Sequence, residues 1–327
     1  MHSTSHFARR LIGIAALACS TLAFAQDYPT RTITLVLPAP PGGATDVLAR
    51  VMADELGKRL GQTVIVDNKP GASGLLGASA VARAAPDGYT LFFSHATPIY
   101  YAPYMFSKVP YDVRRDFAFI TEICSASLVF AVGKDVPVQN MKELVSWATA
   151  NKGKVNYGSF GVGSSSHLLM AHLSESRHLD MAHAAYKGEA PMIQDILGGQ
   201  IPMGIGTLGT MAPHLASGRL KALAIVGDKR LPELPNVPTM VEAGFPDDEF
   251  KPLGGVMLTA PAKTPAPILA RLEKEARAVV QTAAMKARFQ AFGLVGMGNS
   301  SAEFRKNFEA SGPVIQKLVQ VSGAKVD

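Results

Sequence analysis

Apolar positions change their spacing several times in the first third of the chain. Residues 32–37 form an apolar run of strand length, and apolar residues then recur every four positions from Leu48 to Leu60, until Gly61. The first pattern is typical of a buried strand and the second of one apolar helix face. The same alternation continues to residue 94 and predicts strands at 32–37, 63–67 and 90–94 and helices at 45–60 and 73–84. It favours an α/β fold with largely parallel sheets.

Two longer β-prone runs, 120–133 and 219–227, separate this region from two further sets of elements. Each run is long enough to leave one sheet and enter another. Between them the pattern predicts helices at 140–151, 165–176, 190–197 and 209–217 and strands at 154–158, 180–184 and 201–206. After them it predicts a strand near 254–261, one long helix over 267–292, a short strand at 294–297 and a terminal helix at 301–322.

Two chain crossings, near 122–133 and 219–230, indicate a hinged pair of α/β lobes. The predicted organisation is a signal peptide over 1–25, the first part of lobe 1 over 26–125, lobe 2 over 126–226 and a return segment of lobe 1 over 227–327. Ligands bind open α/β sheets at the carboxyl ends of their strands. The loops that follow those strands converge only if the two lobes face each other.

The first 25 residues have the pattern of a secretory signal. Arg9 and Arg10 precede an apolar stretch, and Ala23-Phe24-Ala25 offers a cleavage site before Gln26. A lipoprotein cysteine at Cys19 is the alternative, although Ala16 stands where that signal usually carries leucine. No later stretch has the ~20 apolar residues of a membrane span. The sequence therefore predicts an exported, periplasmic protein without stable membrane insertion, and a monomer.

Charge and cysteine content exclude some functions. The formal charge is +6, and removal of the two leader arginines leaves +4, with lysines and arginines scattered along the chain. This suits a small anionic ligand and disfavours nucleic acid. Cys124 is the one cysteine outside the leader, so an intramolecular disulfide is excluded. The neighbours of Cys124 in the sequence suggest that its side chain is small, buried and packed in the core.

The first glycine-rich corner lies between the strand at 32–37 and the helix at 45–60, at Pro40-Pro41-Gly42-Gly43. Such a corner directs unpaired N–H groups and the positive end of a helix dipole outward. We expect Gly42, Gly43 and Thr45 to contact a carboxylate. The alternative is a tight turn with Thr45 as N-cap and Asp46 as a first-turn acid. Asp46 disfavours a bulky phosphate, and no P-loop lysine follows.

The second corner, at Gly161-Val162-Gly163, is richer in hydroxyl groups. Four serines surround it, and all four are candidate ligand contacts: Ser159, Ser164, Ser165 and Ser166. One of them is expected to cap the following helix, which leaves others for a ligand. Tyr157 stands where a nucleophile elbow needs glycine, so Ser159 is expected to donate hydrogen bonds and not to attack substrate.

Three further side chains follow predicted strands and are candidate contacts: His95, Tyr186 and Lys187. For Lys187 the alternative is ordinary solvation. The histidine pairs His167/His172 and His178/His183 are five residues apart, which does not suit one helix face, so we expect neither a metal nor another cofactor. No acid/base pair is arranged for turnover, so a catalytic residue is not expected.

The mature chain resembles the Bug family, the extracytoplasmic substrate-binding proteins of tripartite tricarboxylate transporters. The resemblance rests on six strings in order: PAPPGGATDVLAR (38–50), VIVDNKPGASGLLGASAVARAAPDGYTL (64–91), VPYDVRRDFAFI (109–120), VNYGSFGVGSSSHL (155–168), AYKGEAPMIQDILGGQI (185–201) and LPELPNVPTMVEAGFP (231–246). It implies a two-lobed, type II (Venus-flytrap) periplasmic binding-protein fold that closes over a small organic carboxylate. In the family the PGG loop, ordered waters and the serine-rich helix start hold one carboxylate.

Two positions depart from the family pattern. Ala39 stands where the family usually has an aromatic residue, which implies a larger pocket lined by Ala39. Gly206 stands near an acidic position that the resemblance associates with an amino group of the ligand. Without an acidic residue at this position, an amino-acid ligand is less favoured and there is room for a larger or more apolar acid.

The sequence thus predicts a non-enzymatic solute-binding protein that delivers a carboxylate to the membrane components of a transporter. A ligand sensor for a two-component kinase needs the same cleft and is the first alternative. An exported enzyme is the second. The sequence does not identify the ligand or the transporter.

Overall fold

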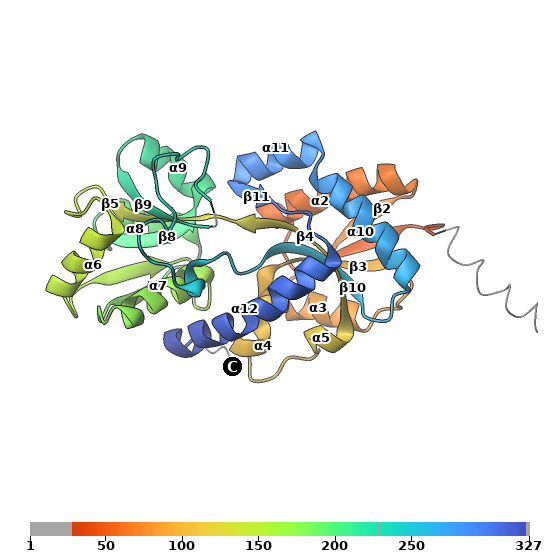
Figure 1. The fold of residues 1–327 in the computed structure, drawn as a ribbon. Coiled ribbons are helices and arrows are strands. Elements are labelled where there is room, and N and C mark those ends of the chain that lie inside the picture. Colours follow the sequence, from red (N-terminus) through yellow and green to blue (C-terminus); the bar gives the residue numbers. More distant parts are fainter. Residues whose placement is uncertain (1–27, 228, 325–327) are drawn as a thin grey trace, which may run out of the picture.

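The computed structural model describes residues 28–227 and 229–324, and the leader, Cys19 and the cleavage site lie outside them. Within these ranges the chain forms a mixed α/β structure with one sheet of six strands and one of five. Figure 1 shows the two sheets as the centres of two lobes, with one long strand path and the helix α12 (Ser301–Ser322) running between them. The predicted two-lobed α/β fold is confirmed.

The first sheet collects strands from both ends of the chain. Its spatial order is β11 (Leu294–Gly296), β4 (Phe117–Ala126), β10 (Gly255–Pro261), β3 (Thr90–His95), β1 (Ile33–Leu37) and β2 (Val64–Asn68). The second sheet is built from the middle of the chain. Its order is β7 (Ala182–Ala185), β6 (Asn156–Ser159), β8 (Met203–Thr207), β5 (Leu128–Gly133) and β9 (Leu220–Val226).

The prediction of largely parallel sheets is wrong, because both sheets are mixed. β1 pairs parallel with β2 and β3, and β6 with β7 and β8. The other pairings, which involve β4, β5, β9, β10 and β11, are antiparallel. A parallel pair needs a crossover connection. β4 leads directly to the other lobe and β10 receives the chain from it, so these strands run against their neighbours.

Helices cover both sheets and mostly lie where the pattern predicts them. They are α2 (Ala44–Leu60), α3 (Leu75–Ala82), α6 (Met141–Ala150), α7 (Ser165–Ser176), α8 (Glu189–Leu197), α9 (Leu208–Ala216), α10 (Ala266–Val280), α11 (Ala283–Phe292) and α12. Short helical turns not predicted from the pattern are η2 (Ala72–Gly74), η3 (Thr97–Tyr101), α4 (Ala102–Met105), α5 (Val113–Asp116) and η4 (Asp248–Phe250).

The single helix predicted over 267–292 is also wrong. α10 ends at Val280, and Thr282 begins α11 as its N-cap, with its side chain accepting a hydrogen bond from the Met285 N–H. A side-chain acceptor at this position satisfies an amide that a continuous helix would satisfy with its own backbone. The apolar periodicity runs through both helices and conceals the break.

The chain crosses between the lobes twice. The first crossing is at Ser127, between β4 and β5, inside the predicted range. The second lies later than the predicted 219–230, because β9 stays in the second sheet. Leu231 and Leu234 then pack in one apolar cluster of that lobe, and Phe245 and Phe250 in another. The chain therefore returns only over 251–254.

The return strand approaches the first crossing closely. A Cβ on Gly255 would lie 1.9 Å from the Cys124 carbonyl oxygen, so only glycine fits there. The lobes also share an apolar contact: Leu168 of α7 packs in a cluster with Tyr101, Met105 and Phe304 of the first lobe. None of the helices in the described ranges is both long and apolar enough to cross a membrane.

Candidate ligand-binding site between the lobes

A cavity of about 330 Å³ lies between the two lobes, beside the crossings. The first lobe contributes the loop His95–Thr97 after β3, Tyr101 and the facing ends of β4 and β10. The second lobe contributes Phe160, the start of α7 and residues of β5 and β9. This is the size and position of a small-molecule site between domains.

The second glycine-rich corner forms part of the cavity wall. Ser164 is the N-cap of α7, where its hydroxyl accepts from the His167 N–H at 3.4 Å and donates to the Gly161 carbonyl at 2.6 Å. Gly163, Ser164 and Ser165 line the cavity. The first amides of α7 have no preceding helical carbonyl, so this wall offers N–H donors at the positive end of a helix dipole.

The hydroxyls of the second corner are not equally available. Ser166 accepts from the Phe160 N–H at 3.1 Å and lies 3.0 Å from the Ser164 hydroxyl. Ser159 bonds to the Gly161 carbonyl at 3.1 Å and to His183 Nε2 at 2.7 Å. Ser159 and Ser166 are buried and do not line the cavity. Within the described ranges, Ser165 is the corner serine whose hydroxyl has no internal partner and which faces the cavity.

Two stacked histidines brace the second corner. The rings of His167 and His183 are parallel, with centroids 3.8 Å apart. Burial, and then the neighbouring His183, lower the pKa of His167 to about 4, and burial also lowers the pKa of His183. Neutral His167 accepts a hydrogen bond from the Gly163 N–H at its Nδ1, at 3.1 Å. The sequence spacing argued against His167 as a metal ligand, and the structural role of His167 was not predicted.

The first corner is arranged differently. The N-cap of α2 is Gly43, so the alternative interpretation, with Thr45 as N-cap, is wrong. Asp46 accepts from the Gly42 N–H at 3.0 Å and from Arg50 and Asn68, and Asn68 also donates to the Ala39 carbonyl at 3.0 Å. Burial opposes the ionisation of Asp46, but these bonds outweigh it and lower its pKa to about 2. Asp46 therefore braces the loop.

The first corner does not line the cavity. Ala39, Gly42, Gly43 and Thr45 lie outside its wall, and a Cβ on Gly42 or Gly43 would meet nothing within 4 Å. The Gly42 amide is already bonded to Asp46. The amides that begin α2 are thus the donors that this exposed loop still offers.

His95 connects the first corner to the cavity. It lines the cavity at the end of β3, accepts from the Thr97 N–H at 3.3 Å, and has the Pro38 carbonyl as a partner. Burial lowers the pKa of His95 despite that carbonyl. A neutral imidazole therefore stands between the two regions.

Tyr186 and Lys187 do not reach the cavity. The Tyr186 hydroxyl donates to Asp195 Oδ2 at 2.7 Å, and burial followed by Asp195 raises its pKa to about 12. Lys187 is exposed. Cys124 is buried and lines the cavity, and burial raises the pKa of its thiol to about 12, so it is a poor nucleophile.

Sequence reasoning missed most of the cavity wall. Tyr101 belongs to the helical turn η3, and Lys251 and Leu253 to the return crossing. The Gly254-Gly255 pair at the start of β10 is a signal that could have indicated a close approach there. No spacing in the sequence links these residues to α7.

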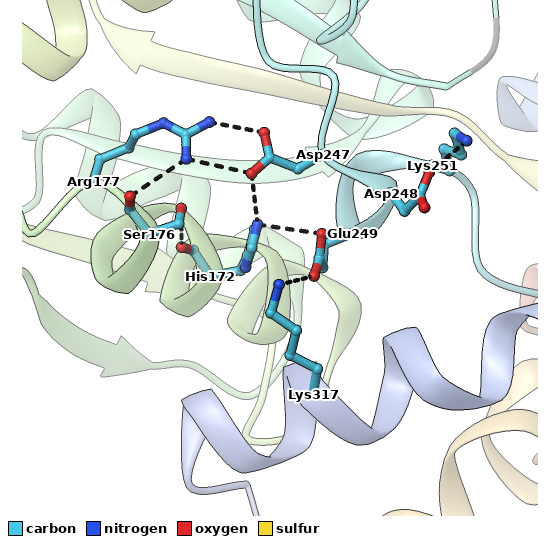
Figure 2. A network of polar contacts seen from close by, with 8 residues as sticks. All are labelled: His172, Ser176, Arg177, Asp247, Asp248, Glu249, Lys251 and Lys317. Carbon is cyan, nitrogen blue, oxygen red and sulfur yellow. Dashed lines mark hydrogen bonds and ion pairs between the residues drawn. The ribbon is translucent and has the colours of Figure 1, made fainter.

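A polar network centred on buried His172 joins α7 to α12 (Figure 2). His172 Nε2 lies 3.3 Å from Asp247 Oδ1 and 3.6 Å from Glu249 Oε2. These three atoms lie within 4.8 Å of one another, as a metal site requires. Arg177 pairs with Asp247 at 2.7 Å, and Lys317 of α12 pairs with Glu249 at 2.5 Å.

The charges of this network are already compensated. Burial opposes ionisation of Asp247 and Glu249, but the bonds from Arg177 and Lys317 outweigh it and lower both pKa values. Each carboxylate thus has its own cation. The ion pairs connect α12 to Glu249, and Asp247 and Glu249 to the residues of α7 and its C-terminal end. A metal ion would add uncompensated positive charge here.

Comparison with known families identifies one match over most of the chain. Residues 48–319 match the family described as "Tripartite tricarboxylate transporter family receptor". Protein BugT of Bordetella pertussis is 34% identical over 283 residues, which is 86% of this chain and 86% of BugT.

Solved structures agree with this match. An R. palustris protein solved with adipate is 30% identical, with a TM-score of 0.75, covering 92% of this chain and 100% of that one. MatC of Rhodopseudomonas palustris, solved with bound malate, is 29% identical, with a TM-score of 0.70, covering 89% of this chain and 100% of MatC. The periplasmic binding-protein fold that the sequence strings implied is confirmed.

Proposed function

The chain belongs to the tripartite tricarboxylate transporter receptor family, and on this premise we propose that it captures a small organic carboxylate between its lobes and delivers it to the membrane components of a transporter. It does so as a non-enzymatic, periplasmic binding protein. The relatives solved with adipate and malate bind carboxylates, which supports the same ligand class for this chain.

The inter-lobe cavity is the observation that supports this function best. Its wall contains the start of α7, the free Ser165 hydroxyl and neutral His95. A carboxylate placed there accepts from backbone amides and one hydroxyl, which is a charge-assisted arrangement that needs no cationic side chain. The exposed amides of the first corner, at Gly43 and the start of α2, reach the same carboxylate when the lobes approach.

The cavity wall offers little for catalysis. Within residues 28–227 and 229–324 it contains no carboxylate side chain, and its histidine is neutral and held by Pro38 and Thr97. A general base needs access to a substrate proton and a nucleophile needs activation. We therefore propose binding without turnover.

Gly43→Val tests the part played by the first corner. Because φ at Gly43 is −79° and an added Cβ meets nothing within 4 Å, the fold accepts the substitution. The valine side chain then occupies the space in front of the amides, so we expect weaker carboxylate binding with a loss of only about 1 kcal/mol in stability. Binding equal to wild type would mean that the first corner is only a turn.

Delivery is tested by uptake of a labelled carboxylate in a bacterial strain that carries the gene and in a matched deletion strain. We expect uptake to fall in the deletion strain and to recover when the chain is restored. Unchanged uptake, with a lost transcriptional response to the acid, would instead support the sensor alternative.

A further inference from the structure

We propose that the ligand is a monocarboxylate with an apolar body, either an aromatic ring or a medium-length alkyl chain, and that acids charged at both ends are disfavoured. This inference rests on the proposed function, because it places the ligand in the same inter-lobe cavity. It adds a substrate class that the family match and the relatives' ligands do not specify.

The first observation is the apolar character of the cavity wall away from α7. Leu128 and Phe160 contribute from the second lobe, Leu253 from the return crossing, and Leu294 from β11. Leu168 adds an apolar surface from the first turn of α7 itself. These residues come from separate parts of the chain, so the apolar lining belongs to the tertiary structure and not to one local run. Such a surface stabilises an apolar body by removing it from water.

The second observation is the lack of a cationic side chain in the cavity wall that could pair with another negative charge. Among the cavity-lining residues that the structure describes, none is an arginine, and the lysine present, Lys251, pairs with Asp248 at 2.5 Å. His95 is neutral and engaged with Thr97 and Pro38. A second carboxylate held among leucines would lose its hydration without a compensating cation.

The third observation is size. The cavity has a volume of about 330 Å³. A cavity of roughly 150 Å³ already accommodates a benzene ring. A ring or a six-carbon chain therefore fits, with its carboxylate at the start of α7.

Matched pairs of acids test the inference by isothermal titration calorimetry at neutral pH. Hexanoate is compared with adipate, and benzoate with terephthalate, because each pair shares a body and differs by one carboxylate. We expect each monoacid to bind about tenfold or more tightly than its diacid, since the extra charge must be desolvated.

The outcomes separate this inference from the proposed function. Diacids that bind as tightly as the monoacids, or more tightly, would overturn the inference and leave carboxylate capture intact. If no carboxylate of either kind binds, the proposed function fails and the inference fails with it.

A second test introduces a cationic side chain into the wall of the inter-lobe cavity. Thr97 lines the cavity, and Thr97→Arg should shift the affinity ratio toward adipate by about tenfold. The matched control is Thr63→Arg, which adds the same charge at an exposed position outside the cavity and should leave the ratio unchanged. A folded Thr97→Arg protein with the wild-type ratio would contradict a ligand body in this cavity.

Discussion

The two glycine-rich corners look alike in sequence and differ in the structure. Each joins a strand to a helix, and each carries polar residues at the helix start. The second corner packs across the lobe boundary, where a Cβ on Gly163 would lie 2.1 Å from Met105 Cε, and it lines the cavity. The first corner faces open space at Gly42 and Gly43.

The two corners are also braced by different chemistry. Ionised Asp46 holds the first corner by accepting from the Gly42 N–H, Arg50 and Asn68. Neutral His167 holds the second by accepting from the Gly163 N–H. A shared motif therefore sets the local geometry, whereas the packing partner decides whether the corner forms a wall of the cavity. Four predictions test this difference.

The largest expected effect is on stability at the two glycines. Gly163→Ala should destabilise the protein by about 2 kcal/mol, because φ is +73° there and the new methyl group meets Met105. Gly43→Ala should cost less than about 1 kcal/mol, since φ is −79° and the space is open. Urea denaturation measures both. Equal losses would remove the difference between the corners.

The pH dependence of the second corner is the next effect. The folded-state pKa of His167 is about 4, below its ordinary value of 6.5, so the unfolded chain takes up the proton first. The stability contributed by neutral His167 should be complete above about pH 6.5 and should fall as the pH drops toward 4. In His167→Gln, whose amide oxygen can accept from Gly163, this slope should be reduced. If the unfolding free energy of His167→Gln depends on pH as strongly as that of the wild type, His167 does not stabilise the second corner.

The first corner should respond in a more acidic window. The pKa of Asp46 is lowered from 3.8 to about 2, so its contribution is present above about pH 4 and is lost as the pH falls toward 2. We expect roughly 1–2 kcal/mol of stability to disappear over this range. Asp46→Asn should lack that loss. If the variant and the wild type decline in parallel, Asp46 does not hold the loop.

The smallest effects concern adjacent serines of the second corner. Ser164→Ala removes the N-cap of α7 and should cost about 1 kcal/mol of stability. Ser165→Ala should leave stability within about 0.5 kcal/mol but weaken carboxylate binding by about 0.5–1.5 kcal/mol. Thermal unfolding and calorimetry measure the two quantities. The reverse pattern would mean that Ser165 is structural.

Periodic residues made the elements predictable. The apolar repeat from Leu48 to Leu60 gave α2 within one residue, and the serine run before His167 gave α7 at its observed bounds. The break at Thr282 could not be predicted because apolar spacing continues through it. Both crossings were predicted. The second occurs later in the sequence than expected, because apolar residues from Leu231 to Phe250 pack in the second lobe.

The candidate site was less predictable than the fold. His95, Ser164 and Ser165 line the cavity, whereas contacts from Ala39, Gly42, Gly43, Thr45, Ser159, Ser166, Tyr186 and Lys187 to a ligand remain predictions. Leu253 and Phe160 carry no sequence signal of their own, because only the packing of α7 on the first lobe brings them together. The meeting of His172 with Asp247 and Glu249 likewise joins residues more than 70 positions apart.

The central claim is that the inter-lobe site recognises a carboxylate by its charge, through the amides at the start of α7. Calorimetric titration of benzoate and of benzamide tests it most directly, because the two share one shape and only benzoate is an anion. We predict that benzoate binds measurably and that benzamide binds at least about tenfold more weakly, since it lacks charge-assisted hydrogen bonds. Equal affinity for the two compounds would contradict recognition of a carboxylate.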